Sequence, residues 1–261
     1  MYHTDQLQRK IEIPFPPKRI ISLVPSQSEL LWDLGLHDEL AGITKFCIHP
    51  DEMFRGKTRV GGTKNVNFEK IKALHPDLII ANKEENKQEQ VEELMKHYPV
   101  WISDIKNLDH SVHMIRSVGA ITGKKEKAGA IAEDILRSFS SLPAPNSLPP
   151  TAYIIWKDPI MAAGHDTFIN NMLWRCGFKN IFDPTYTRYP ELKMEELSKL
   201  NPELILLSSE PYPFKEKHME EFRMACPQAK VLLVDGEMFS WYGSRLLKAP
   251  AYFSSLLVLL K

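Results

Sequence analysis

Aromatic side chains are concentrated in the segments that follow the predicted strands, where they could bind a small molecule. Large aromatic rings hold a bulky, partly apolar ligand by stacking and by burying apolar surface. The aromatic residues of these segments are Phe46, Trp156, Tyr186, Tyr189, Phe239, Trp241 and Tyr242. Basic residues in the same segments could bind acidic or amide groups at the edge of the ligand, and these are Lys45, Lys64, Arg188 and Arg245. Three other tryptophans, Trp32, Trp101 and Trp174, fall inside predicted helices or strands and are expected in the core.

Histidines offer a second kind of chemistry, direct capture of a metal ion. A Zn, Mn or Fe site needs three or four converging His, Asp or Glu side chains. His49 and His165, together with Glu84 or Glu210, are the candidates for such a site. We interpret the segment around Cys47 and His49 as a structural loop in preference to a metal site, and free-metal binding stays an alternative.

Known catalytic motifs are incomplete or absent in this sequence. Residues 119–125 imitate a phosphate-binding loop, but the segment is one residue short and ends in lysine where Ser or Thr must hold magnesium. No GxSxG, HExxH or strand-linked GxGxxG motif is present. The sequence therefore predicts a protein that is not an enzyme and holds no catalytic cofactor.

The amino-acid composition argues against several other classes of protein. The 33 basic and 33 acidic residues balance, whereas a nucleic-acid-binding protein normally carries a basic excess. Apolar residues make up 43% of the 261, which is typical of a globular chain. Three cysteines are too few for a disulfide framework and fit a reducing compartment. We expect no nucleic-acid partner.

Neither end of the sequence predicts membrane insertion. The first twenty residues contain no apolar run of signal-peptide type, and residues 249–260 fall short of the ~20 needed to span a bilayer. As written, the chain is expected in the cytoplasm. It would be periplasmic or exported if a segment upstream of Met1 has been removed.

Three segments recur in the same order in the two halves of the chain. Residues 31–36 resemble 173–178, residues 67–80 resemble 193–206, and residues 100–104 resemble 231–235. The second pair contains a helix that ends before Pro76 or Pro202, because the residue before proline is pushed out of the helical region. A continuous apolar run follows each proline, and such runs are typical of strands buried on both faces of a parallel sheet. This repeat predicts that the chain folds into two similar lobes.

The first strong element is a strand over residues 19–24, followed by a turn and a helix. Ser26 and Glu29 have the spacing of a capping box, and Gly35 is the expected end of the helix.

The fold class is therefore α/β, with two similar lobes whose mainly parallel sheets are covered by helices. A predicted helix over residues 124–139 would join the lobes, and a ligand cleft is expected between them. The proposed boundaries are an N-terminal lobe over 1–122, a bridging helix over 123–142 and a C-terminal lobe over 143–261. The proline-rich segment 142–150 is predicted to be irregular.

These features together resemble the helical-backbone solute-binding proteins of ABC transporters, the group that receives cobalamin and ferric siderophores. The resemblance covers residues 19 to about 253 and is nearest to the cobalamin-binding branch. It is carried by residues 19–26 with Glu29, by residues 60–62 and 67–79, and by residues 164–182 and 195–202. In that branch aromatic side chains hold the corrin, and Tyr189 stands in a loop where such proteins have a tryptophan. Residues 63–65 lack the tryptophan expected in the first lobe.

The resemblance implies non-catalytic binding of a bulky metal chelate, either a cobalamin-like corrinoid or an iron chelate, by a monomer. The predicted ligand-binding residues are Ser26, Lys45, Phe46, Lys64, Trp156, His165, Tyr186, Arg188, Tyr189, Trp241, Tyr242 and Arg245. The resemblance also implies that Glu69 and Glu195, at equivalent places in the repeat, dock onto the permease of an ABC transporter. Two alternatives stay open: a receptor for a free metal ion, and an intracellular enzyme or metal-insertion partner on the same fold.

Overall fold

The computed structural model describes residues 1–142 and 148–260. The described chain forms two compact units. Unit 1 contains Met1–Ile105, Asp109–Leu136 and Trp241–Leu247, and the remainder of the chain forms unit 2. Most of the proline-rich segment 142–150 lies outside the described residues. Segment 241–247 belongs to unit 1, although the sequence boundaries assigned it to the C-terminal lobe.

Unit 1 is built on a five-stranded sheet in the order β5-β4-β3-β6-β7, in which all neighbouring strands are parallel. Its strands are β3 (Ile20–Ser22), β4 (Leu40–Ile43), β5 (Thr58–Arg59), β6 (Leu78–Asn82) and β7 (Val100–Ser103). A separate antiparallel pair, β1 (Tyr2–Thr4) and β2 (Lys10–Glu12), precedes them. The central strands β3 and β6 are buried along their whole length, as their apolar runs predict.

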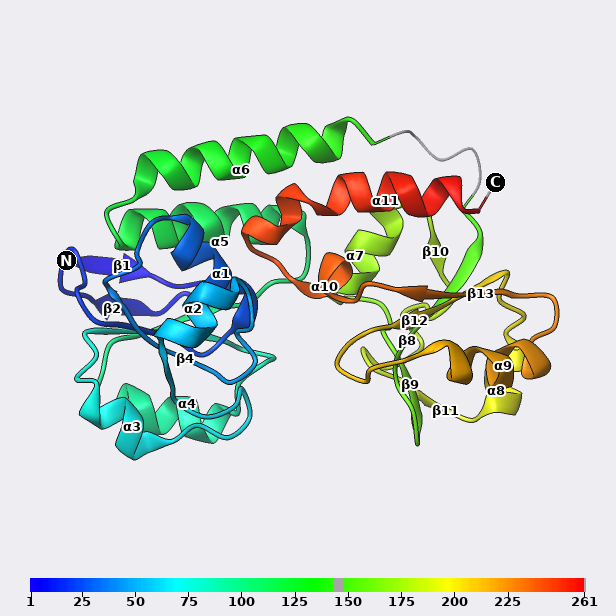
Figure 1. Cartoon of the computed structure of the whole chain (residues 1–261), viewed down its shortest axis with the longest axis horizontal. Coiled ribbons are helices and arrows are strands. Elements are labelled where there is room, and N and C mark those ends of the chain that lie inside the picture. The colour runs from blue at the N-terminus through cyan, green and yellow to red at the C-terminus, as the bar shows by residue number, and fades with distance from the viewer. Residues whose placement is uncertain (143–147, 261) are drawn as a thin grey trace. The chain divides into compact units, whose positions relative to one another are not determined.

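Helices cover both faces of this sheet. They are α1 (Pro25–Asp33), α2 (Asp51–Gly56), α3 (Phe68–Ala73), α4 (Gln88–Met95), α5 (Leu108–Ile121) and α6 (Lys125–Ser140). Figure 1 shows α3 and α4 on one side of the sheet and α5 on the other. Ile71 of α3 and Val91 and Leu94 of α4 share one buried cluster with the strands. The predicted helix over 124–139 is confirmed as α6, which belongs to unit 1 through Leu136 and to unit 2 from Arg137.

Unit 2 has a mixed sheet in the order β11-β9-β8-β12-β13, with β10 paired to β8. Its strands are β8 (Pro150–Trp156), β9 (Ile160–Ala162), β10 (Lys179–Asn180), β11 (Glu191–Leu192), β12 (Leu204–Ser208) and β13 (Lys230–Val234). β8, β10, β12 and β13 pair in parallel, while β9 and β11 are antiparallel to their neighbours. Its helices are α7 (Phe168–Arg175), α8 (Met194–Lys199), α9 (Glu216–Ala225), α10 (Glu237–Ser240) and α11 (Ala249–Val258).

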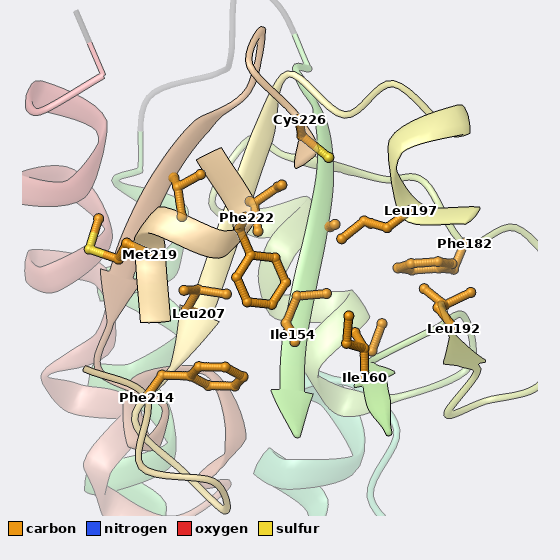
Figure 2. Close-up of a cluster of buried hydrophobic side chains, with 14 residues drawn as sticks. Ile154, Ile160, Phe182, Leu192, Leu197, Leu207, Phe214, Met219, Phe222 and Cys226 are labelled. Carbon is orange, nitrogen blue, oxygen red and sulfur yellow. The ribbon is translucent and has the colours of Figure 1, made fainter. Parts of the chain in front are cut away.

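One face of the unit 2 sheet is covered by α8 and α9. Phe222 lies at the centre of the buried cluster, against Ile154 of β8 and Leu207 of β12, with Leu197 of α8 and Met219 of α9 around them (Figure 2). Burying these side chains supplies the apolar driving force that holds this face together.

The internal repeat is confirmed in the geometry of both units. α1 and α7 end in the same way, with Gly35 at φ 79° and Gly177 at φ 88°. In each case the glycine N–H and the following N–H donate to carbonyls of the last helical turn, which is the Schellman arrangement that glycine permits. The second repeated segment forms α3 and β6 in unit 1 and α8 and β12 in unit 2.

Two sequence interpretations are wrong. Ser26 and Glu29 form no capping box, because Pro25 starts α1 with Val24 as the N-cap, and the Glu29 carboxylate instead binds Arg245. Trp174 is not a core residue: it is 61% exposed near the end of α7. Trp101 is fully buried as expected.

Candidate functional site

Polar side chains fix the loops that leave the carboxyl ends of the unit 1 strands. The amide of Asn82, at the end of β6, donates to the Ser103 hydroxyl at 3.0 Å, and the amide of Gln27 donates to the same hydroxyl at 2.5 Å. Asn86 donates to the carbonyls of Leu23 and Thr63 at 3.1 and 3.0 Å. These buried amide donors hold the ends of three strands in one arrangement.

The loop after β4 presents two exposed residues of the predicted site, Lys45 and Phe46. The Phe46 ring is 50% exposed, and the Lys45 ammonium lies 5.0 Å from its centroid. The backbone N–H of Lys45 donates to the Gly61 carbonyl at 2.8 Å, so the loop is tied to the end of β5. Lys45 and Phe46 therefore form a cationic and aromatic surface at this edge of the sheet.

Cys47 attaches the same loop to α1 through its buried thiol. Its buried thiol lies 3.1 Å from both the Ser28 hydroxyl of α1 and the Thr44 hydroxyl. Burial raises the pKa of the Cys47 thiol to about 11, against a smaller lowering by those two hydroxyls. Cys47 is thus a protonated structural residue at neutral pH.

Lys64 lies in the next loop and is directed to the backbone. Its ammonium donates to the Glu84 carbonyl at 2.6 Å, and the side chain is exposed. This contact ties the loop before α3 to the loop after β6 while leaving Lys64 at the surface.

Four of the predicted residues are buried in unit 1. Ser26 packs against the backbone of Gly243, and the Tyr242 hydroxyl donates to the Glu85 carboxylate. Burial, and then the charge of Glu85, hold the pKa of Tyr242 well above its usual value. The Arg245 guanidinium donates two hydrogen bonds to Glu29 and lies 4.6 Å from the Trp241 ring centroid.

In unit 2, Trp156 stands at the end of β8 and is 40% exposed. Its ring packs edge-on against Tyr212 at 5.6 Å, and Tyr212 in turn contacts Phe214 and His218. The loop after β12 and the start of α9 therefore supply an aromatic wall beside Trp156.

A second unit 2 cluster is organised by Asp166. The Lys106 ammonium binds its carboxylate at 2.8 Å and thereby holds the pKa of Asp166 below its usual value. The Arg188 guanidinium donates to the Asp166 carbonyl at 2.9 and 2.6 Å and lies 5.9 Å from the ring centroid of Tyr189, which is 37% exposed. His165 precedes Asp166 and is half-buried. Arg188 and Tyr189 therefore lie beside Asp166, the residue that follows His165.

Tyr186 is partly buried. Its ring packs edge-on against Phe182 at 5.4 Å and against the hydrophobic cluster of Figure 2. This contact positions the loop that continues to Arg188 and Tyr189.

The candidate metal ligands are divided between the units: His49 and Glu84 belong to unit 1, and His165 and Glu210 belong to unit 2. His49 packs edge-on against the Trp241 ring, with 5.7 Å between centroids. Across residues 1–142 and 148–260, no group of three or more His, Cys, Asp or Glu side chains is placed to hold a metal ion.

Several residues of the candidate site were not predicted from the sequence. Glu85 and Asp166 direct neighbouring side chains, yet nothing in their local sequence marks them. Tyr212 could have been found, since it follows the apolar run of β12 closely in an aromatic and proline-rich segment.

The two predicted docking residues occupy matching places. Glu69 in α3 and Glu195 in α8 are each the second residue of their helix, and both are exposed. A carboxylate there also interacts favourably with the positive end of the helix dipole.

Two α/β units of common design, each with aromatic and basic side chains in loops at the ends of its strands, define a two-lobed binding protein. The chain belongs to the periplasmic binding protein family, whose family model matches residues 20–225. The expected family is thereby confirmed.

Curated relatives match over most of the chain. The vitamin B12-binding protein of Pectobacterium carotovorum is 26% identical over 250 residues, which cover 94% of this chain and 90% of the relative. The vitamin B12-binding protein of Vibrio cholerae is 28% identical over 199 residues, covering 75% and 72%. These relatives are binding proteins, in agreement with a non-catalytic function.

Solved structures show the same fold. The periplasmic vitamin B12-binding protein BtuF of Vibrio cholerae superposes with a TM-score of 0.78 at 23% identity, covering 94% of this chain and 98% of that chain. The periplasmic haem-binding protein BhuT gives 0.76 at 18% identity, covering 92% and 99%. The two-lobed α/β fold expected from the sequence is thus confirmed.

None of the helices in the described part of the chain combines the length and the apolar character that crossing a membrane requires.

Proposed function

We propose that this protein binds a bulky metal chelate reversibly, as the solute-binding component of an ABC-type uptake system. A cobalamin-like corrinoid is the first candidate, and a haem or ferric siderophore is the second. Relatives named vitamin B12-binding proteins support the first candidate. Neighbours of the same fold include a haem-binding protein, which supports testing the second.

One observation carries the proposal: each unit exposes large aromatic rings beside cationic groups in loops at the ends of its strands. In unit 1 these are Phe46 with Lys45, and in unit 2 they are Tyr189 with Arg188, together with Trp156. The carboxyl ends of parallel strands are where α/β sheets bind ligands, and Phe46 follows β4 while Trp156 ends β8. Aromatic faces suit a broad macrocycle, and cations suit the acidic or amide groups at its rim.

The predicted residues divide into two roles. Phe46, Trp156 and Tyr189 are accessible and would contact the ligand, as would the cations Lys45, Lys64 and Arg188. Ser26, Tyr242 and Arg245 are buried and would support the binding loops. The location of the ligand between two lobes stays a prediction.

Equilibrium dialysis against cyanocobalamin, haemin and a ferric siderophore, followed by absorption spectroscopy, tests this function. We expect one coloured ligand to be retained at a 1:1 ratio and to be released on unfolding. Retention of none of them, with Zn, Mn or Fe found by elemental analysis, would favour the free-metal alternative and reject the chelate.

Uptake also requires a partner, and we propose that Glu69 and Glu195 dock onto basic residues of an ABC permease. Both carboxylates are exposed at equivalent helix positions, as a two-fold partner would need. Exposed charges at such an interface chiefly set the rate of association and its salt dependence. This role places the protein outside the cytoplasmic membrane, so fractionation of the native protein and sequencing of its N-terminus test the proposal.

A further inference from the structure

The segment Trp241–Leu247, here named the strap, returns from unit 2 to pack within unit 1. Its backbone closely approaches α1: a Cβ built on Gly243 would lie 2.5 Å from the Ser26 carbonyl oxygen. Only glycine fits at this distance. Ser244–Leu247 then form a short 3-10 turn.

A buried ion pair joins the strap to α1. The Glu29 carboxylate accepts hydrogen bonds of 2.9 and 2.7 Å from Nε and Nη2 of Arg245, 216 residues further along the chain. Both residues are 6% exposed. A bidentate pair of this kind fixes the plane of the guanidinium as well as its position.

Two further contacts connect the guanidinium of Arg245 to the loop of unit 1 that carries Phe46. The Arg245 guanidinium lies 4.6 Å from the centroid of the Trp241 ring, and that ring also packs against His49 in a T-shaped contact. His49 closes the loop that carries the exposed Phe46. A continuous chain of contacts therefore runs from the Glu29 carboxylate to the end of this loop.

The same helix supports the middle of the loop. Ser28, the residue before Glu29, places its hydroxyl 3.1 Å from the buried Cys47 thiol. Phe46 thus directly precedes an anchor at Cys47, and a second anchor follows two residues later at His49. The anchor at Cys47 contacts Ser28, and the anchor at His49 is connected to Glu29, the next residue of α1.

We propose that Glu29 is a positioning residue for ligand binding, which acts through Arg245, Trp241 and His49 to hold the loop of Phe46 in its binding arrangement. This inference rests on the proposed function, because it assumes that Phe46 contacts the ligand. Glu29 itself is buried and acts only through the strap.

The first test measures ligand affinity in variants of the pair. Glu29→Gln leaves the Arg245 charge buried without its counter-ion and could unfold the protein, so the double variant Glu29→Met with Arg245→Met removes both charges together. The control is Asp5→Asn, which breaks the partly buried pair of Asp5 with Arg9 elsewhere in unit 1. We expect the dissociation constant for cyanocobalamin to rise about tenfold in the double variant and to stay unchanged in the control. Equal effects of the two would overturn the proposal.

A double-mutant cycle tests whether the effect passes through Phe46. If Glu29 positions that ring, Phe46→Ala added to the double methionine variant should weaken binding by much less than it does alone. Fully multiplicative effects would show that the pair and Phe46 act independently and would refute the positioning role.

A readout without ligand separates this inference from the proposed function. Protein labelled with 4-fluorophenylalanine gives a fluorine resonance for Phe46, assigned by its loss in Phe46→Leu. We expect this resonance to shift or broaden in the double methionine variant and to be unaffected by Asp5→Asn. An unmoved Phe46 resonance refutes positioning by Glu29, whereas failure of the wild-type protein to bind cyanocobalamin, haemin or a siderophore refutes the function alone.

Discussion

His75 and Asn201 adopt the same left-handed backbone conformation, with φ 45° and 47°, each directly before a proline. They hold equivalent positions in the two units, where a short helix gives way to a buried strand. Both side chains are exposed, so the backbone geometry and not packing selects the residue. Asn tolerates this conformation better than most residues because its side chain can bond locally.

A β-branched residue at position 201 should therefore destabilise unit 2. We expect Asn201→Ile to lower the free energy of unfolding by about 1–2 kcal/mol, since the left-handed region brings Cβ against the carbonyl. Asn201→Gly should be nearly neutral. Urea denaturation of both variants measures the difference, and equal stabilities would mean that the backbone carries no such strain.

Alkaline pH should destabilise the protein partly through Cys47. Its folded pKa of about 11 lies above the ordinary thiol value, so the contribution of the protonated thiol is complete below that ordinary value. Above it, the unfolded thiol ionises first, and stability falls by about 1.4 kcal/mol per pH unit until about pH 11. Cys47→Ala should have a shallower slope of unfolding free energy against pH between 9 and 11. Parallel slopes would contradict this reading.

The unit 2 core should be sensitive at Phe222, which is fully buried on α9. Truncation of Phe222 to alanine should lower the free energy of unfolding by about 3–5 kcal/mol through lost burial and a residual cavity. Met224, on the same helix and 73% exposed, provides the control, and its change to alanine should alter stability by no more than about 0.5 kcal/mol. Similar losses for the two would show that the cluster of Figure 2 does not carry the stability of this unit.

The sequence predicted the fold well because its repeated parts are governed by local rules. A glycine follows the end of α1 and the end of α7. A proline follows α3 and α8 before the next strand begins. The apolar runs after these prolines form the buried strands β6 and β12. Each of these outcomes depends on neighbouring residues, and neighbouring residues are what a sequence shows.

The candidate site was harder because its contacts are distant in sequence. Spacing alone assigned Glu29 to a capping box, whereas its partner Arg245 lies near the other end of the chain. Likewise, nothing local indicates that Tyr242 is buried against Glu85 while Tyr189 is exposed. Loop aromatics can be recognised from the sequence, but their division between surface and interior requires the fold.

That division gives a last prediction, which compares Tyr189 with Trp241. Tyr189 is 37% exposed and Trp241 is 6% exposed, although both are aromatic loop residues. Tyr189→Ala should weaken binding of the retained ligand by at least about 1–2 kcal/mol while the melting temperature of the ligand-free protein stays unchanged, as expected for a contact residue. Trp241→Ala should lower that melting temperature as well, because it removes a buried ring and leaves a cavity between Arg245 and His49.

Calorimetry of the ligand-free variants and titration with ligand give the two quantities separately. Phe46→Ala should behave like Tyr189→Ala, since its ring is also exposed and lies beside a cation. If Tyr189→Ala lowered the melting temperature without weakening binding, its ring would be structural and the unit 2 half of the binding surface would be misassigned. If Trp241→Ala weakened binding with no loss of stability, the ring would contact the ligand directly, and the strap would belong to the binding surface and not to its support.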